Sequence, residues 1–246
     1  MNLSILCILL WQRVCSHHNT FPDLIPIDLD VRSYMHAPQI AVTRVDSEYK
    51  TCLFDIEEEH QSKYKIGNVW DGVFKVYDDS DIILTRNIFY IFIPFIRSYI
   101  QINSRYLHSS GKITMETVEF VKHATEEHYV ELIREPVTFD LAQLPLAPLV
   151  IILKEINGYK EFVVDEFFKM DMFIGAVING HAVIDNRVHG VIYKIVRLEI
   201  ISPEKHKVTV KTLTKHGVEY LDEFESTRCG NAFNYLQTLH EESSTF

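Results

Sequence analysis

One short pattern occurs twice in this chain, about 108 residues apart. Residues 66–77 read Ile-Gly-Asn-Val-Trp-Asp-Gly-Val-Phe-Lys-Val-Tyr, and residues 174–185 read Ile-Gly-Ala-Val-Ile-Asn-Gly-His-Ala-Val-Ile-Asp. In each copy a turn-forming dipeptide, Asp71-Gly72 or Asn179-Gly180, separates two apolar runs. A two-residue type I′ loop needs positive φ at both positions, which Asp, Asn and Gly tolerate, so each copy predicts a β-hairpin. A hairpin repeated at this distance predicts a duplicated β-module.

Other segments repeat at nearly the same distance. Residues 26–31 resemble residues 136–141, and the Tyr-Lys pair at 49–50 recurs at 159–160. The runs 40–45, 82–93, 188–201 and 208–213 are rich in Ile, Val, Tyr and Phe, with turn residues between them, and are expected to be strands. The predicted fold is mainly β, with two tandem homologous modules of seven or eight strands, each a sandwich or a partly open barrel.

The expected domains follow from these repeats. Module one is placed at 26–124 and module two at 134–228. The apolar run at 3–11, followed by the small residue Ser16, predicts a signal peptide over 1–16 and thus a secreted protein. Residues 17–25 are expected to be a flexible lead-in, and 229–246 a tail with a short helix capped by Asn231. No other run is long enough to cross a membrane, so the mature chain is expected to have no transmembrane segment.

The charge and cysteine content of the chain limit which classes of partner and which disulfides are expected. The formal net charge of −10 disfavours binding to a phosphate backbone, so nucleic acid is not an expected partner. Cys7 and Cys15 fall in the signal peptide, which leaves Cys52 and Cys229. Cys52 is either a small core residue or half of a Cys52–Cys229 disulfide. Aligning the two Tyr-Lys pairs places Phe162 at the position of Cys52, which favours the core role.

The first hairpin offers a candidate binding patch. If Val69 pairs with Phe74, then Gly67, Val69, Phe74 and Val76 form the buried face. The opposite face then carries Trp70, Lys75 and Tyr77, and exposed Trp and Tyr are enriched at binding hot spots. The alternative is that this face packs on a second sheet or on the other repeat.

An acidic stretch precedes the same hairpin. Glu57, Glu58 and Glu59 are consecutive, and the second repeat has no such run. They are expected to be either a solvated loop or a docking site for a basic partner.

These features resemble the FAINT-domain proteins of Theileria parasites. The resemblance rests on the opening strand Asp28-Leu29-Asp30-Val31, the Tyr-Lys strand, the Val-x-[Asp/Asn]-Gly hairpins at 69–72 and 177–180, and the later alternating strands at 99–103 and 207–211. It covers about residues 25–124 and 134–228. It implies an exported parasite protein that acts in or on the host cell, in a family whose motifs carry no catalytic signature.

The chain shows no motif of a known catalytic class. It lacks a Gly-x-Ser-x-Gly elbow, a phosphate loop, a dinucleotide fingerprint and a Cys-x-x-Cys pair. His181, Asp185 and His189 have a spacing that suits metal ligation on a helix, but on a strand and its turn they are expected to be ordinary polar positions. We therefore expect no enzyme activity, no metal and no cofactor. The expected function is binding of a host protein, and the alternative is carriage of an apolar small ligand or lipid within the β-modules.

Overall fold

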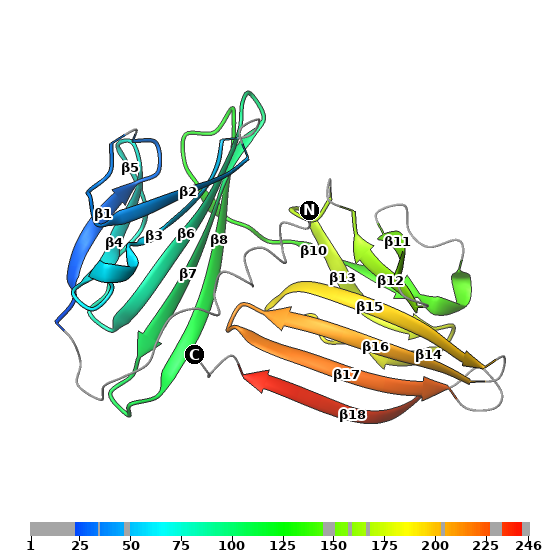
Figure 1. The fold of residues 1–246 in the computed structure, drawn as a ribbon. Helices are drawn as coiled ribbons and strands as arrows, with labels where there is room; N and C mark the ends of the chain where they lie inside the picture. Colours follow the sequence, from blue (N-terminus) through cyan, green and yellow to red (C-terminus); the bar gives the residue numbers. More distant parts are fainter. Residues whose placement is uncertain are drawn as a thin grey trace. The chain divides into compact units, whose positions relative to one another are not determined.

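The computed structural model describes residues 23–33, 35–46, 50–144, 151–156, 159–165, 168–202, 205–226 and 233–242. The chain divides into two compact units at the junction between Val130 and Glu131. Regular structure is almost entirely strand, which confirms the predicted fold of two β-rich modules (Figure 1). The expected signal peptide and most of the lead-in, residues 1–22, lie outside the described residues.

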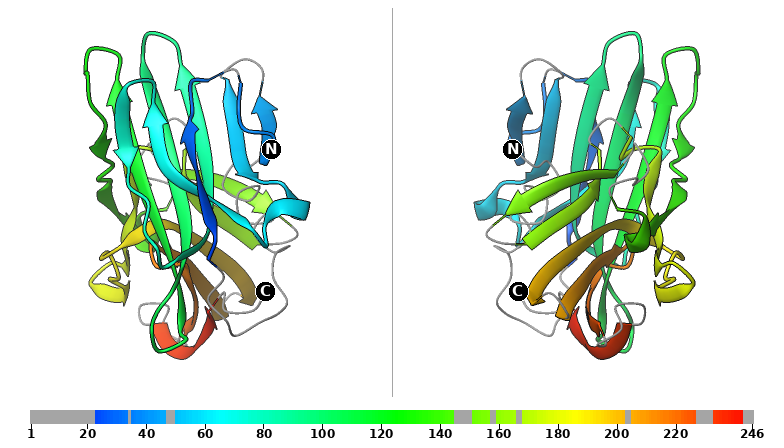
Figure 2. Two further views of the ribbon diagram at one scale, coloured as in Figure 1. Left: turned by 90° about the vertical axis from the view of Figure 1, so that its left-hand side faces the viewer. Right: turned by 90° about the vertical axis from the view of Figure 1, so that its right-hand side faces the viewer.

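Unit 1 contains two sheets. The smaller has the order β1-β4-β5, with β1 and β4 parallel, and the larger has the order β2-β3-β6-β7-β8-β9. The long strands β6, β7 and β8 lie side by side (Figure 2). A short 3-10 turn, η2 (Glu58–His60), precedes β4. The strands are β1 (Ile25–Asp30), β2 (Ile40–Asp46), β3 (Thr51–Ile56), β4 (Tyr64–Asp71), β5 (Phe74–Tyr77), β6 (Ile83–Ile93), β7 (Arg97–Leu107), β8 (Ile113–His123) and β9 (Val130–Glu131).

Unit 2 repeats this topology, so that each strand corresponds to the one nine places earlier. Its sheets have the orders β10-β13-β14 and β11-β12-β15-β16-β17-β18. A 3-10 turn, η3 (Leu141–Gln143), follows the first strand. The strands are β10 (Glu135–Asp140), β11 (Ile151–Ile156), β12 (Tyr159–Val164), β13 (Met172–Asn179), β14 (Ala182–Asp185), β15 (Val191–Ser202), β16 (Lys205–Thr214), β17 (Val218–Ser226) and β18 (Phe233–Glu242).

The two units share irregularities as well as strand order. The parallel pair β1–β4 has a bulge between Ile27 and Leu29, and the pair β10–β13 has one at the equivalent place, between Val137 and Phe139. A bulge is a specific geometric feature, so its recurrence is strong support for a duplicated module.

The cores lie between the two sheets of each unit and use equivalent positions. Alternate residues of both sheets point inward and exclude water, which is the main stabilising contribution in such a layered fold. The buried core residues of unit 1 that have a buried counterpart in unit 2 include Leu29, Val31, Ile40, Phe54, Ile66, Val69, Ile88, Ile100 and Ile102. Their counterparts in unit 2 are Phe139, Leu141, Ile151, Phe162, Ile174, Val177, Val196, Val208 and Val210.

The hairpins form where predicted, but the predicted register is wrong. Asp71 pairs with Phe74 and Trp70 with Lys75, so the loop residues are Gly72 and Val73. Gly72 has φ +65°, and Val73 does not have a positive φ. This is the pattern of a type II′ turn, which needs Gly only at its first central position and spares a β-branched residue the left-handed conformation. Unit 2 does the same with Gly180 at φ +60°.

The predicted equivalence of Cys52 and Phe162 is also wrong. Phe54 pairs with Ile88, and Phe162 pairs with Val196, the counterpart of Ile88. Phe162 is therefore equivalent to Phe54. The two Tyr-Lys pairs are not structurally equivalent, because aligning them shifts the strands by two residues from the register in the structure. Cys52 nevertheless packs partly buried against the core of unit 1 as a free thiol. Cys229 lies outside the described residues.

The short helix expected near the carboxyl end is wrong over its described part, because residues 233–242 form strand β18. Phe233, Leu236 and Leu239 are spaced like one face of a helix. In the structure these residues do not share a face, because Phe233 pairs with Ser226 and Leu239 pairs with Leu221 on the opposite face of β17. Leu236 is the extra residue of a bulge between Tyr235 and Gln237. Asn231, the expected cap, lies outside the described residues.

Candidate functional site

The outward face of the β4–β5 hairpin carries a tryptophan held by polar neighbours. The Nζ of Lys75 lies 5.7 Å from the centroid of the half-buried Trp70 ring. The indole Nε1 of Trp70 donates to Asp28 Oδ2 at 3.4 Å, and Asn68 donates to Asp28 Oδ1 through both its backbone and its side-chain nitrogen at 3.0 Å. Sequence patterns could not reveal Asp28, because it comes from β1, 40 residues before Asn68. We call Asp28, Asn68, Trp70, Val73 and Lys75 the Trp70 face.

The Trp70 face has no counterpart in unit 2, although its scaffold does. The positions of Asp28, Asn68, Trp70, Val73 and Lys75 are taken there by Thr138, Ala176, Ile178, His181 and Val183. The buried neighbours on the other side of the hairpin are alike in both units. The two units therefore present different surfaces on one framework.

Tyr77 does not lie on this face, so the prediction that groups it with Trp70 is wrong. Because Val76 is bulged, Tyr77 pairs with Val69 and points toward the core. Its ring packs against Phe120 with centroids 5.8 Å apart, and Arg86 lies 5.0 Å from its centroid. Burial raises the pKa of the Tyr77 hydroxyl, which marks it as an interior group.

The acidic stretch is exposed but lies apart from Trp70. Glu57, Glu58 and Glu59 are all exposed, at and beside the turn η2. This turn precedes Tyr64, the first residue of β4, whereas Trp70 is near the end of that strand. Six residues of strand span about 20 Å. The structure therefore brings Trp70 and Lys75 together and leaves the acidic stretch toward the other end of β4.

A repeated aspartate fixes each hairpin to the strand beside it. Asp30 Oδ1 accepts from the backbone N–H of Gly72 at 2.9 Å, and Asp140 Oδ1 accepts from that of Gly180 at 2.8 Å. Sequence reasoning missed this role, although the repetition of Asp30 as Asp140 was a usable signal. These bonds hold the turn at the tip of the Trp70 face.

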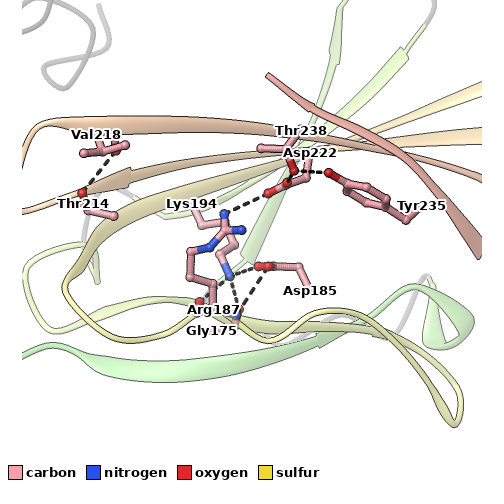
Figure 3. Close-up of polar contacts among 9 residues, drawn as sticks. All are labelled: Gly175, Asp185, Arg187, Lys194, Thr214, Val218, Asp222, Tyr235 and Thr238. Atoms are coloured by element: carbon pink, nitrogen blue, oxygen red, sulfur yellow. Dashed lines mark hydrogen bonds and ion pairs between the residues drawn. The ribbon is translucent and has the colours of Figure 1, made fainter. Parts of the chain in front are cut away.

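A buried cation ties the two sheets of each unit together. In unit 2, Lys194 Nζ bonds the carboxylate of Asp185 and donates to the carbonyl oxygens of Gly175 at 2.6 Å and Arg187 at 2.7 Å (Figure 3). Burial lowers the pKa of Lys194, an effect that Asp185 opposes. All three ammonium donors are used, so Lys194 is arranged as a structural brace and not as a nucleophile.

The equivalent cation in unit 1 is Arg86, which is 1% exposed. Its Nη1 donates to the carbonyl of Gly67, the counterpart of Gly175. Its Nε donates to Ser104 at 3.1 Å and its Nη2 to the carbonyl of Asp78 at 3.0 Å. Tyr77 stands where unit 2 has Asp185. A buried cation that bonds the carbonyl of the equivalent glycine is thus common to both units. The carboxylate of Asp185 that pairs with it in unit 2 is replaced by the Tyr77 side chain in unit 1.

Unit 1 has a second charged cluster beneath the hairpin. Asp71 is fully buried, and its carboxylate bonds both Arg32 and Lys122. Lys122 Nζ also lies 4.8 Å from the Tyr129 ring centroid and 5.9 Å from that of Phe74. Sequence reasoning treated Asp71 only as a turn former. The cluster joins the turn after β1 to β4 and β8 and stiffens the base of the Trp70 face.

Residues in the described part of the chain do not gather three His, Cys, Asp or Glu side chains in a way that could hold a metal ion. Of the spaced trio, His181 and His189 are exposed, while Asp185 is buried against Lys194. The described residues also include no helix with the length and apolar character that crossing a bilayer requires.

No protein-family model, curated protein or solved structure matches this chain.

Proposed function

We propose that this chain is an exported parasite protein that binds a host protein through the Trp70 face and performs no catalysis. The resemblance to FAINT-domain proteins supports the export and the host setting. The observation that carries the binding proposal is the difference between the two hairpins. They share one framework, but the outward face of unit 1 carries an aromatic ring and charged side chains, whereas that of unit 2 is mostly aliphatic, with Thr138 and His181.

The Trp70 face has the chemistry of an energetic anchor. Binding energy at protein interfaces concentrates in a few residues, with Trp among the most frequent. Asp28 and Lys75 hold the indole from two sides, so less side-chain entropy is lost when a partner covers it. Beside it, Val73 is 84% exposed at the tip of the turn and adds apolar area.

The neighbouring charges give the surface its selectivity. Lys75 Nζ lies 2.6 Å from Asp78 Oδ1, and Asp28 is exposed beside the indole, so charges of both signs surround the ring. The expected partner surface is an apolar pocket with a mixed polar rim. The acidic stretch 57–59 is too far away to share that pocket, and we assign it a role in electrostatic steering of a basic partner.

The test is affinity capture from host-cell lysate with residues 17–246 as bait. Trp70→Ala removes the anchor, and Ile178→Ala is the matched control at the equivalent position of unit 2. We expect a protein that wild type and Ile178→Ala enrich equally and Trp70→Ala does not. Direct binding of that protein, once purified, must show the same order. Equal enrichment by all three baits would contradict the proposal.

The acidic stretch is tested separately by replacing Glu57, Glu58 and Glu59 with Lys. A steering role predicts a slower association rate whose difference from wild type shrinks as salt is raised, with little change in the dissociation rate.

A further inference from the structure

The terminal strands of the sheets present backbone groups that could pair with another chain. Proteins protect such edges by short length, by charge, by proline or by bulges. In the described part of the chain, seven of the eight terminal strands are short or have no more than four consecutive residues without a charge or a proline. β5 and β14 have four residues and β9 has two; β1 contains Pro26, Asp28 and Asp30, β10 contains Glu135, Pro136 and Asp140, β2 contains Arg44 and Asp46, and β11 contains Lys154 and Glu155.

Strand β18 is different. It is ten residues long, and from Phe233 to Leu239 it contains neither a charged residue nor a proline. Tyr235, Leu236 and Leu239 are 57%, 49% and 47% exposed. The bulge at Leu236 is the one protective feature in this stretch. An edge whose first seven residues carry no charge and expose apolar side chains is a site where pairing with another strand is favoured.

The edge is fixed in place and ready to pair. The Thr238 hydroxyl donates to Asp222 and bonds the Tyr235 hydroxyl (Figure 3). Gln237 Nε2 donates to Glu223 at 2.7 Å. Asp222 in turn accepts from Arg187 at 2.8 Å. Because β18 is already ordered against β17, an incoming strand does not have to supply the cost of ordering it.

We propose that β18 pairs antiparallel with β18 of a second copy of this chain, so that two six-stranded sheets join edge to edge. The charge pattern selects this occupant and this direction. Antiparallel pairing sets the acidic end, Glu241 and Glu242, beside the uncharged end of the other copy, which begins at Phe233. Parallel pairing would bring the acidic residues together, which is unfavourable for like charges on neighbouring strands.

The two-fold symmetry of this contact limits the assembly to two copies. Each copy uses the same strand, so the contact closes as a dimer and does not propagate into a fibre. A contact confined to one strand edge is small compared with the interfaces of obligate dimers. We therefore expect a reversible dimer with a dissociation constant in the micromolar range. It uses β18 of unit 2 and none of the residues of the Trp70 face, so it does not depend on the proposed function.

The test is sedimentation velocity on the full chain, from low to high micromolar concentration. Wild type should shift from monomer to dimer. Leu236→Lys with Leu239→Lys places like charges on the joined edge and should weaken dimerisation at least tenfold. Ile200→Lys with Ile201→Lys, at two exposed apolar residues (55% and 49%) of the inner strand β15 of the same unit, is the matched control and should dimerise like wild type. Circular dichroism checks that each variant is folded.

A second measurement does not rely on a variant. Backbone amides of residues 233–242 in wild type should exchange hydrogen more slowly at high than at low protein concentration. A wild type that remains monomeric, a Lys variant that dimerises as tightly as wild type, or exchange in β18 that does not depend on concentration would each overturn the proposal.

Discussion

Replacing Lys194 by Met tests the buried brace of unit 2. Lys194 is 2% exposed and its partner Asp185 is 8% exposed. Met keeps the apolar stem but leaves the Asp185 carboxylate and the carbonyls of Gly175 and Arg187 without their shared donor. Breaking a buried ion pair by removing one partner costs about 3–5 kcal/mol. With an m-value of about 2 kcal/mol/M in urea, the midpoint for unit 2 should fall by about 2 M.

The assay follows the two units separately during urea unfolding. Residues 17–246, the chain expected after removal of the signal peptide, contain one tryptophan, Trp70, so its fluorescence reports on unit 1. Far-ultraviolet circular dichroism reports on both units. Lys194→Met should move the dichroism transition and leave the Trp70 transition in place.

Two further variants decide the cause of the loss. Lys194→Arg copies Arg86 of unit 1 and should lose much less stability, because a guanidinium keeps donors for the carbonyls. Adding Asp185→Leu to Lys194→Met removes the unpaired carboxylate and should recover about 2 kcal/mol. A loss below about 1 kcal/mol for Lys194→Met, or no recovery in the double variant, would refute the reasoning.

Three other predictions concern stability. Gly175→Ala should destabilise unit 2 by about 1–3 kcal/mol in urea unfolding, because its Cβ would lie 2.6 Å from Pro136 Cβ, whereas Gly67→Ala, with nearest approaches of 3.0 Å, should lose less. Phe95→Gly should stabilise unit 1 by about 1 kcal/mol, because Phe95 has φ +63° and is 97% exposed; a loss of stability would contradict this. Burial raises the pKa of Asp55 to about 6, so folding favours its protonated form. The stability that this form contributes should be present at acidic pH and lost as pH rises through 6, by on the order of 3 kcal/mol at most, and Asp55→Asn should remove that dependence in chemical unfolding from pH 4 to 7.

The duplicated fold could be predicted from the sequence because its signals are local. Each hairpin contains a Gly between β-rich runs, and the strands expected at 40–45, 82–93, 188–201 and 208–213 correspond to β2, β6, β15 and β16. Strand order was not predictable, because the parallel pairing of β1 with β4 joins segments about 40 residues apart.

The wrong predictions arise where a register shift of one residue moves a side chain to the opposite face of its strand. A type I′ loop at Asp71-Gly72 and a type II′ loop at Gly72-Val73 differ by one position, and that shift, with the bulge at Val76, moved Tyr77 from the surface to the core. In β18 the spacing of Phe233, Leu236 and Leu239 imitates a helix, but pairing with β17 places Phe233 and Leu239 on opposite faces and Leu236 in a bulge. Bulges are set by pairing with a neighbouring strand, so a pattern read along one segment does not contain them.

The candidate site was predictable only in part. Trp70 and Lys75 could be grouped because they share a hairpin. Asp28 orients the indole, and Arg32 and Lys122 meet at Asp71, but all three come from segments distant from the hairpin in the sequence. Their charges are ordinary for surface positions, and only the folded arrangement shows that Lys122 is buried.

The most direct test of the binding account is calorimetric titration of the captured host protein into wild type, Trp70→Ala and Ile178→Ala. The account predicts that Trp70→Ala weakens binding by at least 2 kcal/mol, about thirtyfold, as expected for an interface hot spot, and that Ile178→Ala binds like wild type. Equal affinity for wild type and Trp70→Ala, with both folded, would contradict it.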